Sequence, residues 1–252
     1  MIDSHAHYDD EAFDEDREEL LSSVFENGIR KVINVGASME SCKTTLALSE
    51  SYEQIYAAIG VHPSDTGQLT ESDMEWLKEK SSFSKVVAIG EIGLDYYWDE
   101  PDRDIQKKWF RRQLELAKEV KLPVIIHSRE AAADTIDILK EYAGDLTGVI
   151  HCYSYTKESA REFLDMGYSF GIGGVLTFKN AKKLKEAVAY IPMDKLLLET
   201  DCPYLAPDPY RGKRNSSVYI PHVVAVMAQL KGISEEEVIR ITSENTERLF
   251  HI

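Results

Sequence analysis

Short aliphatic runs of strand length alternate with longer segments of helical periodicity along the whole chain. The segment 105–120, for example, gathers Trp109, Phe110 and Leu114 on one helical face. A strand followed by a helix, eight times over, indicates a parallel sheet that closes into a barrel. The eight predicted strands are Met1–His5, Lys31–Val35, Ile55–Ile59, Val86–Ile89, Pro123–Ile126, Gly148–Ile150, Tyr168–Ile172 and Lys195–Leu198.

The predicted fold is therefore an α/β protein of the (β/α)₈ TIM-barrel class. A chain of 252 residues has the usual size of such a barrel, and no linker, low-complexity stretch or repeat divides it. We expect one domain over residues 1–252, in which the tail from Pro221 to Phe250 forms two further helices. An open doubly wound sheet is the alternative, but the sequence has no dinucleotide-binding glycine fingerprint.

Composition restricts the environment and the partners of the chain. The formal net charge is −15, which disfavours sequence-independent binding along a nucleic-acid duplex, because such binding needs many Lys and Arg residues. The odd number of cysteines (Cys42, Cys152 and Cys202) and the absence of a CxxC pair indicate free thiols in a reducing compartment. No bilayer-length apolar run or signal peptide is apparent, so we expect a cytoplasmic protein without a membrane contact.

Residues of metal-ligand type follow the predicted strands at or near their carboxyl ends. In a (β/α)₈ barrel the catalytic groups lie at this end of the strands, so these side chains should meet at one mouth. Nitrogen and carboxylate ligands at such a mouth predict a divalent-metal site that activates water for attack on an electrophile. The candidate ligands are His5, His7, Glu91, His127, His151 and Asp201.

Each candidate also has an ordinary structural explanation. The pair His5 and His7 points to one side of an extended strand, although an HxH pattern alone is weak evidence. Glu91 lies between apolar residues and glycines, where a buried carboxylate needs a cation or an internal salt bridge. His127 and His151 follow buried strands, where hydrogen-bonded core histidines are common.

Considered together, the candidates suffice for two divalent ions. Asp201 has the capping of a turn as its structural alternative, but it completes the set at strand eight. Glu91 is the natural bridge, because it comes from the middle of the strand order. Histidine with carboxylate suits Zn²⁺, Mn²⁺, Fe²⁺ or Co²⁺ better than Ca²⁺, whereas Mg²⁺ prefers more oxygen ligands, and the sequence does not choose among these ions.

Seven motifs in order along the chain resemble those of the TatD family of metal-dependent hydrolases. The resemblance implies an amidohydrolase-like barrel, metal ligation by the same six residues, and a divalent-dependent deoxyribonuclease activity. One departure lies after strand six, where Tyr153, Ser154 and Tyr155 replace the usual Phe and Ser-Gly. The motifs are Ser4–His7, Gly60–Pro63, Gly90–Tyr97, Ile126–Arg129, His151–Ser154, Gly174–Asn180 and Glu199–Leu205.

Several residues are candidates for binding a phosphate substrate. Arg129 follows His127 by two residues, and the densest basic cluster of the chain contains Arg211, Lys213 and Arg214. Guanidinium groups bind phosphate oxygens in a bidentate manner, and together with two metal ions they would form a positive pocket on an acidic body. A solvated charged loop is the alternative for the basic cluster.

The third predicted strand and the rim supply further candidates. His62 follows strand three and either contacts substrate or caps a turn. Aromatic side chains near the rim could stack on bases, or could be ordinary core edge. These are Tyr96, Tyr97, Trp98, Tyr153 and Tyr204.

The leading hypothesis is metal-dependent hydrolysis of DNA phosphodiester bonds, at strand ends or in short single strands. Asp201 and Glu91 are its catalytic residues, with Asp201 as both ligand and proton acceptor. A small-molecule amidohydrolase, lactonase or deaminase on the same barrel is the alternative, because fold alone does not define function. A non-catalytic binding scaffold is disfavoured, since all six ligand types are present. No obligate protein partner is apparent, and a monomer is the default expectation.

Overall fold

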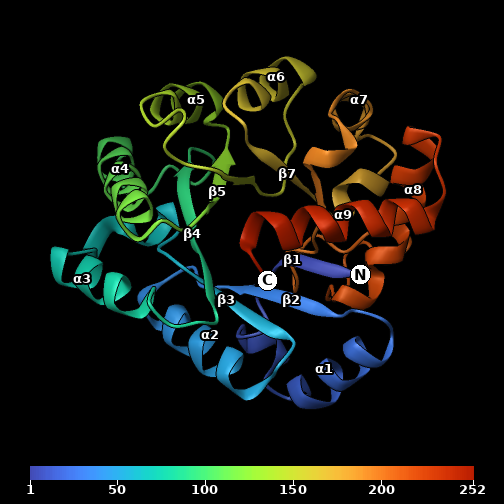
Figure 1. Ribbon diagram of the computed structural model, residues 1–252, viewed down its shortest axis with the longest axis horizontal. Coiled ribbons are helices and arrows are strands. Elements are labelled where there is room, and N and C mark those ends of the chain that lie inside the picture. Colours follow the sequence, from blue (N-terminus) through green and yellow to red (C-terminus); the bar gives the residue numbers. More distant parts are fainter.

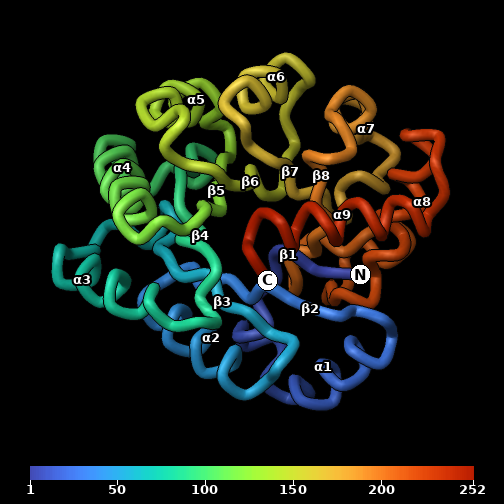
Figure 2. Tube along the Cα trace, viewed as in Figure 1, coloured from blue at the N-terminus to red at the C-terminus, as the bar shows by residue number.

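The computed structural model describes residues 1–252 and contains one eight-stranded parallel sheet in the order β1 to β8. Each strand pairs with the next in the chain, so the sheet curls around a central axis (Figures 1 and 2). The predicted (β/α)₈ barrel is confirmed. The strands are β1 (Ile2–Ala6), β2 (Lys31–Val35), β3 (Ile55–Ile59), β4 (Val86–Asp95), β5 (Val124–Arg129), β6 (Gly148–Ile150), β7 (Ser169–Ile172) and β8 (Leu196–Leu198).

Helices surround the sheet, and Figure 1 shows them as an outer ring with one further helix, α9, across the barrel. The two helices expected after the last strand are confirmed as α8 and α9. None of the helices combines the length and the apolar character needed to cross a bilayer. The helices are α1 (Arg17–Glu26), α2 (Met39–Ser51), α3 (Glu71–Lys80), α4 (Arg103–Val120), α5 (Ala132–Lys140), α6 (Lys157–Asp165), α7 (Lys182–Tyr190), α8 (Ile220–Lys231) and α9 (Glu235–Phe250).

Hydrogen bonds between the first and last strands bring the two edges of the sheet together. The hydroxyl of Ser4 donates to the carbonyl of Leu198 at 3.0 Å. Beyond β8, the Asp201 N–H donates to the His5 carbonyl at 2.9 Å, and the His7 N–H donates to the Cys202 carbonyl at 2.8 Å. The chain after β8 therefore continues along β1 and carries Asp201 to the side of the two histidines.

Aliphatic side chains fill the barrel interior, and the last helix closes one end of it. Ile33 of β2, Ile125 of β5 and Leu197 of β8 belong to a buried cluster that also contains Phe250, the last residue of α9. Because α9 follows β8 and packs against the start of the barrel, its apolar end fills the amino-terminal mouth of the strands. Polar groups at the barrel axis can therefore gather only at the carboxyl-terminal mouth.

Two strands are longer than predicted. β4 extends to Asp95 and β5 to Arg129, so Glu91 and His127 lie inside their strands and do not follow them. The pairing runs from Ile89 opposite Val124 to Ile92 opposite Ile126, which inserts one extra residue on β4. Such a bulge interrupts the strict alternation of side chains, and hydrophobic runs alone do not reveal it.

Candidate metal centre

The structure brings all six predicted ligand residues together at the carboxyl-terminal mouth of the barrel. His5 lies in β1 and His7 directly after it, whereas Glu91 and His127 extend inward from β4 and β5. His5 and Glu91 are fully or almost fully buried. The remaining members, His151 and Asp201, follow β6 and β8.

Three residues form a first donor group, which we define as His5, His7 and Asp201. The Nε2 atoms of the two histidines lie 3.1 Å apart. Oδ1 of Asp201 lies 3.6 Å from His5 Nε2 and 3.4 Å from His7 Nε2. Oε2 of Glu91 faces the same two nitrogens at 3.5 and 3.8 Å. Four donor atoms thus converge on one small volume.

A second donor group consists of His127 and His151. Nδ1 of His127 and Nε2 of His151 lie 3.2 Å apart. Oε1 of Glu91 lies 2.6 Å from the first of these nitrogens and 2.7 Å from the second. Glu91 therefore presents one carboxylate oxygen to each donor group, which is the arrangement of a bridging ligand between two cation positions.

The hydrogen bonds made by the second nitrogens of His7 and His127 are those expected of histidines that bind a divalent cation. Nδ1 of His7 donates to the Val35 carbonyl at 2.7 Å, which leaves the lone pair on Nε2. Nε2 of His127 lies 3.1 Å from Oδ2 of Asp95, which leaves the lone pair on Nδ1. The remaining nitrogens face carboxylate oxygens, at 3.4 Å for His7 and 2.6 Å for His127, where a proton or a cation must lie between the two atoms. A metal-ligating histidine characteristically has its other nitrogen bound in this way.

Burial and local charge act differently on the donors. The carboxylate of Asp201 outweighs burial and raises the pKa of His7 to about 10, and that of Glu91 likewise raises the pKa of His127 to about 9, so a bound cation would displace a proton from each ring. Burial, together with the neighbouring His151, lowers the pKa of His5 to about 4, so its ring is neutral at pH 7. Burial alone would raise the pKa of Glu91, but the charges of His151 and His127 outweigh it and hold that pKa well below its usual range. The bridging carboxylate is therefore ionised.

His62 adds a hydrogen-bond donor beside the two donor groups. The N–H of Ser64 donates to Nδ1 of His62 at 3.2 Å, so the proton of the neutral ring is on Nε2. That Nε2 lies 3.9 Å from Oε1 of Glu91. Burial lowers the pKa of His62 to about 3, and the ring stays neutral. His62 therefore caps a turn, which confirms one of the two alternatives from the sequence, and its ring faces the centre. Its contact with substrate stays a prediction.

Two carboxylates of the centre were not assigned from the sequence. Asp95 is buried at the end of β4 and orients His127. Glu199 is buried beside His151, at 3.9 Å between Oε1 and Nδ1. Each is a carboxylate at the end of a buried apolar strand, and this pattern could have identified both as candidates. What each one contacts depends on the strand lengths and the ring orientations, which only the structure reveals.

The predicted basic cluster divides into separate contacts. The guanidinium of Arg214 binds both carboxylate oxygens of Asp16, at 2.6 and 2.8 Å. Arg211 stacks on the Phe178 ring at 4.3 Å, and Lys213 is exposed. Arg214 is therefore occupied by an ion pair within the chain, whereas Lys213 remains directed to solvent.

The aromatic residues predicted at the rim differ in their exposure to solvent. Tyr97 and Trp98 are 51% and 66% exposed, and Arg129 stacks on the Tyr97 ring at 3.8 Å. Tyr204 is 55% exposed, and its ring lies 6.5 Å from that of His7. Tyr153 is instead buried, which confirms for this residue the alternative of a core position over base stacking. Its ring packs edge-on against aromatic core residues, Phe163 and Phe170.

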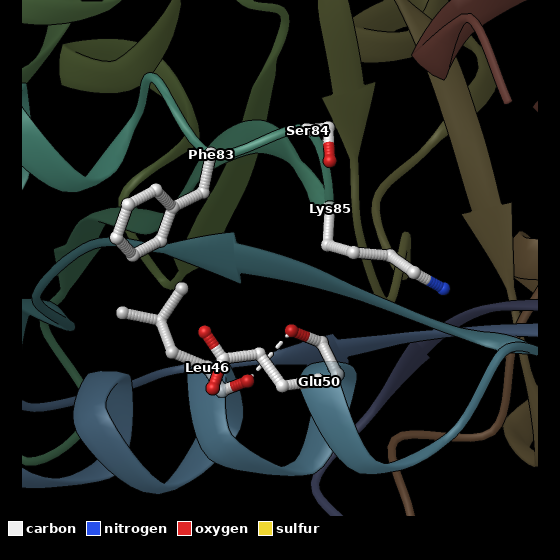
Figure 3. A pocket seen from close by; sticks show the side chains of 6 residues that line it. Leu46, Glu50, Phe83, Ser84 and Lys85 are labelled. Atoms are coloured by element: carbon white, nitrogen blue, oxygen red, sulfur yellow. Dashed lines mark hydrogen bonds between the residues drawn. The ribbon is translucent and has the colours of Figure 1, made fainter.

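A small surface hollow lies away from the donor groups (Figure 3). It is formed by the end of α2 and the segment preceding β4, and is lined by Leu46, Glu50, Phe83 and Lys85 among others. The ammonium of Lys85 is already bound by backbone carbonyls, including that of Ile55 at 3.1 Å. The hollow belongs to the amino-terminal side of the sheet and has no part in the metal centre.

An eight-stranded parallel barrel with a histidine and carboxylate cluster at its carboxyl-terminal mouth is the architecture of the metal-dependent barrel hydrolases. The sequence matches the family described as TatD related DNase over residues 2–251. The chain is a metal-dependent hydrolase of the TatD family.

Individual relatives agree with this assignment over the whole length. The chain is 47% identical over 253 residues to the uncharacterized metal-dependent hydrolase YabD of Bacillus subtilis (strain 168), covering 100% of this chain and 99% of the relative. Among solved structures, it superimposes on YjjV, a TatD homolog from Escherichia coli K12, with a TM-score of 0.94 and 34% identity. That match covers 100% of this chain and 98% of the other. A TatD family hydrolase from Entamoeba histolytica gives a TM-score of 0.87 at 26% identity, covering 99% and 97% of the two chains.

Proposed function

We propose that this protein is a divalent-metal-dependent deoxyribonuclease that hydrolyses phosphodiester bonds at the ends of DNA or in single strands. The observation that carries the proposal is the position of Glu91, whose two oxygens face two separate sets of histidine nitrogens. Two adjacent cations bridged in this way are typical of enzymes that transfer phosphoryl groups to water. The description of the matched family as DNase supports the same reaction.

In this proposal the two donor groups hold two ions, of Mg²⁺, Mn²⁺ or Zn²⁺. His5, His7 and Asp201 hold one, and His127 with His151 holds the other. Glu91 contributes one oxygen to each. When bound, the ions lower the pKa of water and neutralise phosphate charge, which makes attack on phosphorus possible at neutral pH.

Asp201 is proposed as the proton acceptor for the attacking water. Its side chain is 17% exposed, whereas that of Glu91, the other carboxylate that faces the two histidines of the first donor group, is only 4% exposed. Oδ1 is occupied by the two histidines, and Oδ2 is free of a protein hydrogen bond. A carboxylate at the open side of the centre can receive a proton, while Glu91 holds the geometry beneath it.

His62 and the surrounding cations are proposed to bind the phosphate. The Nε2–H of His62 is directed toward the centre, where it can donate to a non-bridging oxygen in the transition state. Arg129, Arg211 and Lys213 supply charge around the mouth. Arg214 is left out of this set because its guanidinium is bound to Asp16.

The acidic body of the protein favours contacts with a few nucleotides. With a net charge of −15, the surface repels a long duplex, so the cations near the mouth can engage only nearby phosphates. The exposed Trp98 and Tyr204 can stack on unpaired bases, which are available at ends and in single strands. Both features support strand ends or single strands as substrate.

The test is hydrolysis of an end-labelled single-stranded oligonucleotide by metal-stripped protein resupplied with Mg²⁺, Mn²⁺ or Zn²⁺. We expect a stepwise ladder with at least one ion and its loss in Asp201→Asn. The matched control is Asp165→Asn, at the end of α6 and outside the metal centre, which should cleave like the wild type. If the wild type cleaves no oligonucleotide with any ion, the nuclease proposal fails, and amides, lactones and small phosphate esters become the substrates to assay.

A further inference from the structure

His5 and His151 share an unusual environment within the centre. Their rings are stacked, with centroids 4.0 Å apart and planes inclined by 12°. Both Nε2 atoms face Glu91, at 3.5 Å for His5 and 2.7 Å for His151. Both Nδ1 atoms are buried and have no hydrogen-bond partner among the atoms of the protein. His7 and His127 differ, because each has a partner for its second nitrogen.

Glu199 lies against this pair of rings. A ligand atom of Glu199 lies within 4.8 Å of one from each of the two histidines, and its Oε1 is 3.9 Å from Nδ1 of His151. The Cys152 N–H donates to the same Oε1 at 2.5 Å. The other oxygen, Oε2, is buried and has no hydrogen-bond partner.

The neighbouring strand is shaped to accommodate this carboxylate. Gly171 of β7 approaches Glu199 so closely that a Cβ on the glycine would lie 1.8 Å from Oε2. No other residue type fits there without displacing the carboxylate. Three buried, unpaired polar atoms in one place are costly unless they bond to one another when the site is in its working state.

We propose that Glu199 is a positioning residue shared by His5 and His151. It accepts hydrogen bonds from their Nδ1–H groups once the carboxylate rotates from its present position, which is 3.9 Å from Nδ1 of His151 and within 4.8 Å of a ring nitrogen of His5. This fixes both rings in the tautomer whose Nε2 lone pair faces Glu91. Because His5 belongs to the first donor group and His151 to the second, one carboxylate supports both cation positions. The inference rests on the proposed metal ligation.

The test compares Glu199→Gln, Glu199→Asp and Glu186→Gln, an exposed control on α7. Metal-stripped proteins are titrated with Mn²⁺ and Co²⁺ by calorimetry, so that the readout does not depend on nuclease activity. In Glu199→Gln we expect affinity to fall by about 10- to 100-fold at both positions. Glu199→Asp, which keeps the charge, should recover part of that loss. His127→Ala, in contrast, should affect chiefly the second position.

A spectroscopic measurement separates positioning from simple structural support. Nitrogen-15 NMR of histidine side chains reports the hydrogen bond made by each Nδ1–H, and we expect hydrogen-bonded Nδ1–H signals from His5 and His151 in the metal-loaded wild type. In Glu199→Gln these two signals should change, whereas those of His7 should not.

Each outcome decides between distinct conclusions. Wild-type metal affinity in Glu199→Gln, or unchanged Nδ1–H signals at both rings, would overturn the role of Glu199 while leaving the proposed function intact. The role would also be overturned if Glu199→Gln lowered only the thermal stability of the metal-free protein and left metal affinity unchanged. If the wild type binds no divalent ion, the proposed metal ligation itself is wrong, and this inference fails with it.

Discussion

Oδ2 of Asp95 lies 3.1 Å from Nε2 of His127, and this contact decides which nitrogen of the ring faces Glu91. The other oxygen, Oδ1, accepts the N–H groups of Tyr97 and Trp98, at 2.9 and 3.2 Å. Both oxygens of Asp95 are therefore acceptors, which only a carboxylate can provide. One residue thus ties the β4 turn to the orientation of His127.

Asp95→Asn replaces one of these acceptors by a donor. Either the turn or His127 then faces an N–H₂ group, and we expect metal affinity to fall by about 10- to 100-fold. The measurement is calorimetric titration of the metal-stripped variant with Mn²⁺. Asp104→Asn, on the first turn of α4, is the control and should bind like the wild type. An unaltered affinity in Asp95→Asn would show that His127 is oriented by other contacts.

His62→Asn keeps a side-chain acceptor for the Ser64 N–H but removes the Nε2–H that is directed toward Glu91. Loss of one donor to the transition state costs about 10²- to 10³-fold in kcat. We expect that fall with metal content unchanged, as measured by steady-state kinetics and elemental analysis of the same preparation. A fall in metal content instead would assign His62 to ligation.

Trp98→Ala tests base stacking at the rim. Stacking of one base on an aromatic side chain contributes about 1–3 kcal/mol, so we expect an about tenfold rise in KM for a single-stranded oligonucleotide. Hydrolysis of bis(p-nitrophenyl) phosphate, which has no base, should be unchanged. Tyr190→Ala removes an aromatic side chain of similar exposure from the end of α7 and serves as the control. Equal KM values for both variants would exclude stacking on Trp98.

Phe250→Ala empties the amino-terminal mouth of the barrel. A buried Phe→Ala change costs about 3–5 kcal/mol of unfolding free energy. We expect that loss in urea unfolding, with metal affinity preserved because Phe250 lies at the opposite end from the donor groups. Phe83→Ala, where the side chain is 41% exposed, should change stability by less than about 1 kcal/mol. A lowered metal affinity in Phe250→Ala would indicate coupling between the two ends.

The sequence was informative about the backbone and less so about the contacts of the side chains. Hydrophobic runs located all eight strands, and His151 follows β6 as predicted because strand ends can be read from where the apolar run stops. Glu91 was predicted to follow its strand because the sequence does not reveal the bulge in β4, beyond which the strand continues. The ion pair between Arg214 and Asp16 joins residues 198 positions apart, and local patterns carry no information on such pairs.

The role of Glu199 was missed for a related reason. Its neighbours are decided by which nitrogen of His151 turns inward and by how closely Gly171 of β7 approaches. Both depend on the register between non-adjacent parts of the chain. Sequence periodicity predicts which face of a strand is buried, but not which atom of a ring meets which oxygen.

The closure of one barrel end by α9 has a practical consequence. Met1 precedes β1, and Phe250 packs into the amino-terminal mouth, so both chain ends lie on the face opposite the donor groups (Figure 1). The open mouth of the barrel is therefore the one that contains the donor groups. A protein attached to a surface through either chain end would keep this mouth facing solvent, where the proposed DNA substrate could be tested in a single-molecule assay.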